Sequence, residues 1–177
     1  MKKIATTLFL AFVCFGVNAQ YLIITKDGVK AKEGNTSYAT VKFPQMSKEE
    51  LKNAIANAVG SRWYYPEKVM NITDSWIVVN TNDYISSGKG KDYMLGAYRF
   101  YIESGSVDFH FDLKEINKHN GGGRDFQYGI VKDRFHRNGL FSKSGKLRRE
   151  ALKNAAEDEI NSEIEWFVGK IEDALVK

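Results

Sequence analysis

The sequence predicts an α+β fold of two layers, in which helices cover one face of a curved antiparallel sheet. Residues 93–116 alternate as a strand pair, a capping box at residues 47–50 begins one helix, and apolar spacing over residues 146–177 indicates a second. From residue 38 onward, the expected order is strand, helix, four strands and helix. Short connections favour antiparallel pairing, and both helices need an apolar sheet face to cover.

The strand pair is the most detailed of these predictions. Residues 93–103 and 106–116 flank Ser104-Gly105, where the glycine can adopt positive φ in a two-residue turn. This turn fixes the register, because a slip of one residue would bury the charged face. Four apolar pairs follow on one face: Ile102 with Val107, Phe100 with Phe109, Tyr98 with Phe111, and Gly96 with Leu113. The other face pairs Tyr101 with Asp108, Arg99 with His110, and Ala97 with Asp112.

The remaining elements are shorter or less regular. An N-terminal β extension is expected at residues 21–25, and a strand at residues 38–43 ends at Pro44. Residues 68–72 and 76–80 suggest a hairpin, followed by a loop at residues 81–92. In the last helix, Ile160, Ile164 and Phe167 belong to the apolar stripe, whereas acidic residues including Glu157 and Glu163 are expected to face water.

Residues 1–19 have the pattern of a secretory signal peptide. Lys2 and Lys3 precede an apolar stretch, and Val17-Asn18-Ala19 fits the small-residue rule for cleavage after Ala19. The stretch is too short to span a bilayer, so we expect no transmembrane segment in the mature chain. A lipoprotein acylated on Cys14 is the alternative, but Phe12 and Val13 stand where small residues are needed. We therefore expect a periplasmic or extracellular protein.

Cleavage would leave residues 20–177 as a single domain. Loss of Lys2 and Lys3 lowers the formal net charge from +4 to +2, and loss of Cys14 leaves no cysteine. Disulfides, cysteine nucleophiles and cysteine-based zinc sites are thereby excluded from the mature chain. A chain of this size can bury a sufficient core without them.

One segment resembles a known family. The run Phe43-Pro44-Gln45-Met46-Ser47-Lys48-Glu49-Glu50-Leu51, followed by Ala54, Ala58 and Trp63, is similar to a secreted bacterial family described as a domain of unknown function with a TBP-like fold. The resemblance covers residues 38–116 and the last helix, and it implies no catalytic residues. It also implies no DNA binding, because one fold serves unrelated functions. We expect no nucleic-acid partner for an exported protein.

The best functional candidate is a basic segment. Residues 117–146 have no sustained periodicity and are expected to form a loop insertion. Residues 114–149 contain ten basic and three acidic residues, with aromatic residues interleaved. An anionic ligand such as a lipid head group or polysaccharide could bind there, or the charges could pair with the acidic last helix. The candidate ligand-binding residues are Arg124, Arg134, Arg137, Arg148 and Arg149.

A catalytic alternative rests on His110, which stands between Asp108 and Asp112 at alternate strand positions. These residues could serve a hydrolase or hold a divalent metal. The competing interpretation is a solvated sheet face in which Arg99 balances the two aspartates. The sequence has no HExxH, GxSxG or P-loop motif, and we expect no metal and no cofactor. We therefore favour a non-catalytic binding or interaction module of the cell envelope, with an envelope protein or a small anion as partner.

Overall fold

A computed structural model describes residues 20–87, 92–120, 124–131 and 138–176, with the side chains of Asn120, Arg124 and Asp125 outside the description. The expected signal peptide lies outside the described residues. In chain order the elements are β1 (Leu22–Thr25), β2 (Gly28–Ala31), β3 (Ala39–Lys42), α1 (Lys48–Arg62), α2 (Pro66–Val69), β4 (Met70–Ile72), β5 (Trp76–Ile85), β6 (Asp92–Glu103), β7 (Ser106–Asn120), β8 (Arg124–Val131), β9 (Asn138–Phe141) and α3 (Glu150–Leu175).

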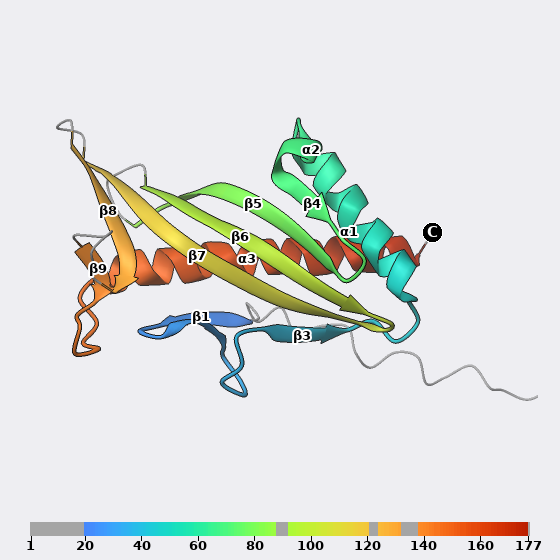
Figure 1. Cartoon of the computed structure of the whole chain (residues 1–177), viewed down its shortest axis with the longest axis horizontal. Coiled ribbons are helices and arrows are strands. Elements are labelled where there is room, and N and C mark those ends of the chain that lie inside the picture. Colours follow the sequence, from blue (N-terminus) through green and yellow to red (C-terminus); the bar gives the residue numbers. More distant parts are fainter. Residues whose placement is uncertain (1–19, 88–91, 121–123, 132–137, 177) are drawn as a thin grey trace, which may run out of the picture.

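Seven strands form one twisted sheet in the order β4-β5-β6-β7-β8-β9, and β3 pairs with the beginning of β7 (Figure 1). All pairs are antiparallel except β8 with β9, which is parallel. The two ends of β7 therefore have different neighbours: residues 106–109 pair with β3, and residues 116–120 pair with β8. β1 and β2 form a separate two-stranded sheet.

The expected β6–β7 register is confirmed. All seven predicted pairs occur, including Phe100 with Phe109 and Arg99 with His110, and Gly105 has φ of +77°. The capping box is also present: the Ser47 side chain accepts from the Glu50 amide at 3.3 Å, and the Glu50 carboxylate accepts from the Ser47 amide at 2.8 Å. These two contacts satisfy amide donors at the start of α1.

Two expected loops are wrong. β5 continues to Ile85 and β6 begins at Asp92, so much of the expected loop at residues 81–92 is strand. Residues 117–146, expected as a loop insertion, include the end of β7 and all of β8 and β9. The paired backbone lets this basic segment extend the sheet, and it satisfies amide and carbonyl groups that a buried loop would leave without partners.

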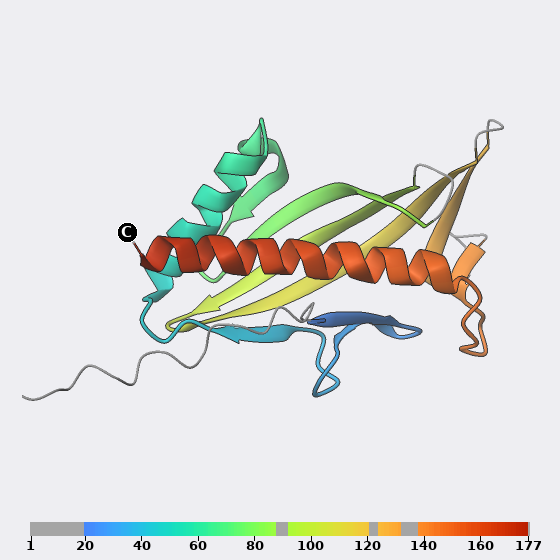
Figure 2. The ribbon, with the colours of Figure 1, turned by 180° about the vertical axis from the view of Figure 1, so that it is seen from behind.

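α1 and α3 cover one face of the sheet. Figure 2 shows α3 lying across the sheet, with α1 crossing near the C-terminal end of α3. The ring of Phe167 on α3 contacts Tyr98 and Phe100 on β6, with ring centroids 6.3 and 4.7 Å apart, and all three residues are fully buried. This aromatic contact joins the long helix to the middle of the sheet.

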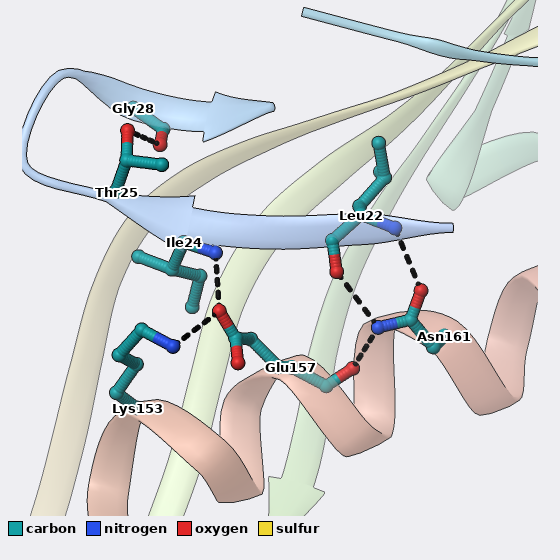
Figure 3. A network of polar contacts seen from close by, with 7 residues as sticks. All are labelled: Leu22, Ile24, Thr25, Gly28, Lys153, Glu157 and Asn161. Atoms are coloured by element: carbon teal, nitrogen blue, oxygen red, sulfur yellow. Dashed lines mark hydrogen bonds and ion pairs between the residues drawn. The ribbon is translucent and has the colours of Figure 1, made fainter. Parts of the chain in front are cut away.

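The N-terminal hairpin is fastened to α3 by side chains. Asn161 accepts a hydrogen bond from the Tyr21 amide at 2.7 Å. It also accepts from the Leu22 amide at 2.8 Å and donates to the Leu22 carbonyl at 2.9 Å (Figure 3). Glu157 accepts from the Ile24 amide at 2.5 Å and pairs with Lys153 at 2.6 Å. The edge of β1 that faces away from β2 is thus hydrogen-bonded to a helix.

These contacts correct part of the sequence prediction for the last helix. Glu157 and Glu163 were expected to face water, but they are only 5% and 3% exposed. Both are buried against groups that complement them, namely the β1 backbone with Lys153 and the guanidinium of Arg62. Lys153 is only four residues from Glu157, but local periodicity could not identify the β1 backbone or Arg62 as partners, because they lie more than 100 residues away in the sequence.

Candidate functional site

A basic pocket lies where β7, β8 and the beginning of α3 meet. It has a volume of about 500 Å³, within the range of small-molecule sites. Its polar and aromatic lining comes from Ser87, Lys118, Phe126, Tyr128, Arg148 and Arg149, and residues 150–152 of α3 complete it. We call this cavity the basic pocket.

The pairing of β7 with β8 positions the residues on two sides of the basic pocket. Lys118 on β7 stands opposite Phe126 on β8, and Ile116 stands opposite Tyr128 in the same ladder. Tyr128 is nearly buried, whereas Phe126 keeps 39% of its surface exposed. The sheet therefore contributes one cation, Lys118, and two aromatic rings to the lining of the pocket.

The third side is positioned by a compact turn after β9. The Ser142 amide donates to the Lys146 carbonyl at 2.9 Å, and the Lys146 amide donates back to the Ser142 hydroxyl at 3.0 Å. The Arg148 amide then donates to the Leu140 carbonyl at 2.8 Å. These bonds hold residues 142–148 against β9, so the next residues reach α3 beside the pocket. A second cavity of about 430 Å³ on this turn shares Arg148.

The electrostatics of the basic pocket favour an anion. Among the described side chains, no ion pair engages Lys118, Arg148 or Arg149. The guanidinium of Arg149 lies 5.8 Å from the centroid of the Tyr128 ring, a cation–π contact that leaves its N–H donors available. Glu150 is the one carboxylate in the lining, so the described lining has an excess of positive charge.

The structure brings together two of the five predicted site residues, Arg148 and Arg149. Arg134 and Arg137 lie outside the described residues, as does the side chain of Arg124. Sequence reasoning did not select Lys118 or Tyr128 for the site. The alternation of Phe126, Tyr128 and Ile130 could have indicated a strand there, but nothing local links that strand to the beginning of α3.

The His110 region has a different arrangement. Asp112 pairs with Arg99, and Asp108 accepts from the Thr40 hydroxyl at 2.5 Å. The imidazole lies between the rings of Trp76 and Tyr38, at centroid distances of 5.5 and 5.0 Å. Burial lowers the pKa of His110, against the opposing effect of the two aspartates. Within the part of the chain that the structure describes, no group of three or more His, Cys, Asp or Glu residues has the arrangement of a metal site.

Comparisons with known proteins come from solved structures. A DUF4468 family protein from Bacteroides ovatus matches with a TM-score of 0.54 and 9% identity, covering 76% of this chain and 84% of that one. A TBP-like protein from Parabacteroides distasonis matches with a TM-score of 0.54 and 14% identity, covering 76% and 90%. No protein-family model and no curated protein matches the chain.

These neighbours bear out the expected resemblance to a bacterial domain of unknown function with a TBP-like fold. The chain has a mixed α+β, TBP-like fold with additional N-terminal strands. At these identities the likeness concerns the fold alone, so it transfers no function. None of the helices in the described ranges has both the length and the apolar character needed to cross a membrane.

Proposed function

We propose that this chain is an exported, non-catalytic binding module, and that the basic pocket binds a small anionic ligand. The observation that carries the proposal is the convergence of Lys118, Arg148 and Arg149 on one open cavity, with no ion pair among the described side chains to neutralise them. Such uncompensated cations attract phosphate or carboxylate groups, and arginine can bind either with two parallel hydrogen bonds.

The aromatic lining favours a ligand that also has an apolar part. Phe126 is 39% exposed beside the pocket, although a phenylalanine gains free energy when it is removed from water. An organic phosphate or carboxylate could cover this ring while its anionic group contacts the arginines. A lipid head group and an acidic saccharide share this chemistry, and they differ in the part of the molecule attached to the anionic group.

Two further observations support a binding role in the envelope. The residues of the catalytic alternative have other contacts: Asp112 pairs with Arg99, Asp108 contacts Thr40, and His110 packs between two rings. The N-terminal sequence favours export with cleavage after Ala19. Protein isolated from the envelope of its host should then begin at Gln20, and a chain beginning at Met1 would contradict export with cleavage.

Calorimetric titration of residues 20–177 with phenyl phosphate and with inorganic phosphate tests the pocket. We expect binding that weakens steeply between about 0.05 M and about 0.5 M salt. In the double variant R148A/R149A, affinity should fall at least tenfold, because each charge-assisted hydrogen bond contributes about 1.5–3 kcal/mol.

A matched control removes the same charge elsewhere. Lys32 and Lys42 are exposed and do not line the pocket, so K32A/K42A should bind within about twofold of the parent protein. Binding that is insensitive to salt, equal weakening in both double variants, or no binding of either probe at about 10 mM would refute the proposal.

A further inference from the structure

A second polar cluster lies between α1, α3 and the covered face of the sheet, away from the residues that line the basic pocket. Its charged members are Arg62, the last residue of α1; Asp83 on β5; and Glu159 and Glu163 on α3. Tyr98 on β6 is fully buried beside them. We call these five residues the buried carboxylate cluster.

Arg62 is held firmly in this cluster. Its guanidinium lies 5.2 Å from the ring centroid of Trp63 and 4.6 Å from that of Trp166, and it forms an ion pair with Glu163. The Glu163 side chain is only 4% exposed. The ion pair thus joins the end of α1 to the middle of α3, with the carboxylate buried and the Arg62 side chain 36% exposed.

One guanidinium cannot neutralise three carboxylates. The groups that act on Glu163 are Arg62 from α1, Asp83 from β5 and Glu159 from its own helix, with Tyr98 facing the cluster from β6. If every carboxylate were ionised, the cluster would have a net charge of −2, with Glu163 buried and Asp83 and Glu159 partly buried. Burial of such an excess charge is strongly unfavourable.

Some buried oxygens around the cluster have no hydrogen-bond partner among the described residues. In the cluster they are one carboxylate oxygen each of Glu163 and Asp83 and the hydroxyl of Tyr98, with the hydroxyl of Thr81 two residues from Asp83 on β5. The free carboxylate oxygens of Glu163 and Asp83 can only accept while ionised, whereas a protonated carboxyl gains a donor. A proton would thus reduce the charge and let a carboxyl donate to a neighbouring oxygen.

We propose that the buried carboxylate cluster is a proton-binding site, with Glu163 as its main carrier, that couples the contact between α1 and α3 to pH. Burial, together with the negative charges of Asp83 and Glu159, raises the pKa of Glu163 to about 7 despite the opposing effect of Arg62. Burial is also the main cause that raises the pKa of Asp83 and of Glu159. Because these groups interact, the proton belongs to the cluster as a whole. This proposal does not depend on the basic pocket.

A carbon-13 NMR titration of the side-chain carboxyls in residues 20–177 tests the proposal directly. We expect the Glu163 resonance to titrate near pH 7, well above the ordinary range of a glutamate. In D83N the Glu163 midpoint should fall, because one repelling charge is gone, whereas in the control E172Q, at an exposed position of α3, it should stay unchanged.

Stability provides a second readout that does not depend on NMR assignment. The urea midpoint of the parent protein should fall as pH rises from 5.5 to 8, and E163Q should lose most of this dependence, because the main proton carrier of the cluster is gone. If E163Q does not fold, the parent titration and D83N still decide the matter. Titration of all glutamates below about pH 5.5, or an unchanged Glu163 midpoint in D83N, would overturn the proposal.

Discussion

Replacing Asn161 with alanine should loosen the N-terminal hairpin from α3. The amide side chain makes three hydrogen bonds to the backbone of Tyr21 and Leu22, at 2.7–2.9 Å. A fourth goes to the Glu157 carbonyl in its own helix, and Figure 3 shows this bond and the two with Leu22. Alanine suits a helix better than asparagine, so α3 itself should form at least as readily. Any loss of stability in N161A therefore reports the missing contacts with β1.

The size of the effect follows from the groups left without partners. The amide and carbonyl of Leu22 are buried, and the Tyr21 amide is partly buried. Each buried group that loses its partner costs about 1–3 kcal/mol, so we expect N161A to lower the free energy of unfolding by about 3 kcal/mol. Water reaching the detached edge of β1 would limit the loss, because the remainder of the domain could stay folded.

Urea unfolding and amide hydrogen exchange together test this reasoning. Exchange at Leu22 and Ile24 should accelerate more than exchange at core positions of β6, since the hairpin detaches first. The control N154A changes the same residue type at an exposed position of α3 and should alter stability by less than about 1 kcal/mol. Unchanged protection at Leu22 in N161A, with unchanged urea stability, would refute the argument.

Three further predictions concern packing, charge and the basic pocket. Gly96→Ala should destabilise the protein by at least about 2 kcal/mol, because a Cβ there would lie 2.2 Å from the ring of Phe111. Gly169→Ala has open space around it and should stabilise α3 by up to about 1 kcal/mol. Thermal unfolding of the two variants measures both effects. The raised pKa of Glu163 should contribute stability that is complete below about pH 4.5 and is lost as pH rises through about 7, by up to about 3 kcal/mol in urea titrations. In calorimetry, Phe126→Ser should weaken the binding of phenyl phosphate several-fold more than the binding of inorganic phosphate. Equal weakening of both would exclude a contact between Phe126 and the phenyl ring.

The parts of the fold that the sequence predicts well depend on local interactions. The β6–β7 register follows from a two-residue turn and alternating side chains, and the start of α1 follows from Ser47 and Glu50. The β8–β9 pair could not be predicted in the same way. It is parallel, one strand has only four residues, and its stability depends on contacts distant along the chain.

The same distinction applies to the candidate site. Charge composition selected Arg148 and Arg149, since a dense run of basic residues is visible in the sequence. Lys118 became part of the pocket only because β7 continues beyond its pairing with Ala39, the first residue of β3, and runs alongside β8. The buried carboxylate cluster was not predicted, because Asp83 was assigned to a loop and Glu163 to the solvent face.

The geometry of α3 explains why acidic residues in a helix can be buried. At about 100° per residue, Ile160, Ile164 and Phe167 lie near the middle of the buried arc. Glu157 and Asn161 lie about 60–100° to one side, where β1 presents its backbone, and Glu159 and Glu163 lie as far to the other side, where α1 presents Arg62. A helix that packed only against a sheet would bury only its apolar stripe. Because α3 is flanked by a strand edge and by the end of α1 that carries Arg62, its buried arc is wider, and each added side carries polar groups that contact its neighbour.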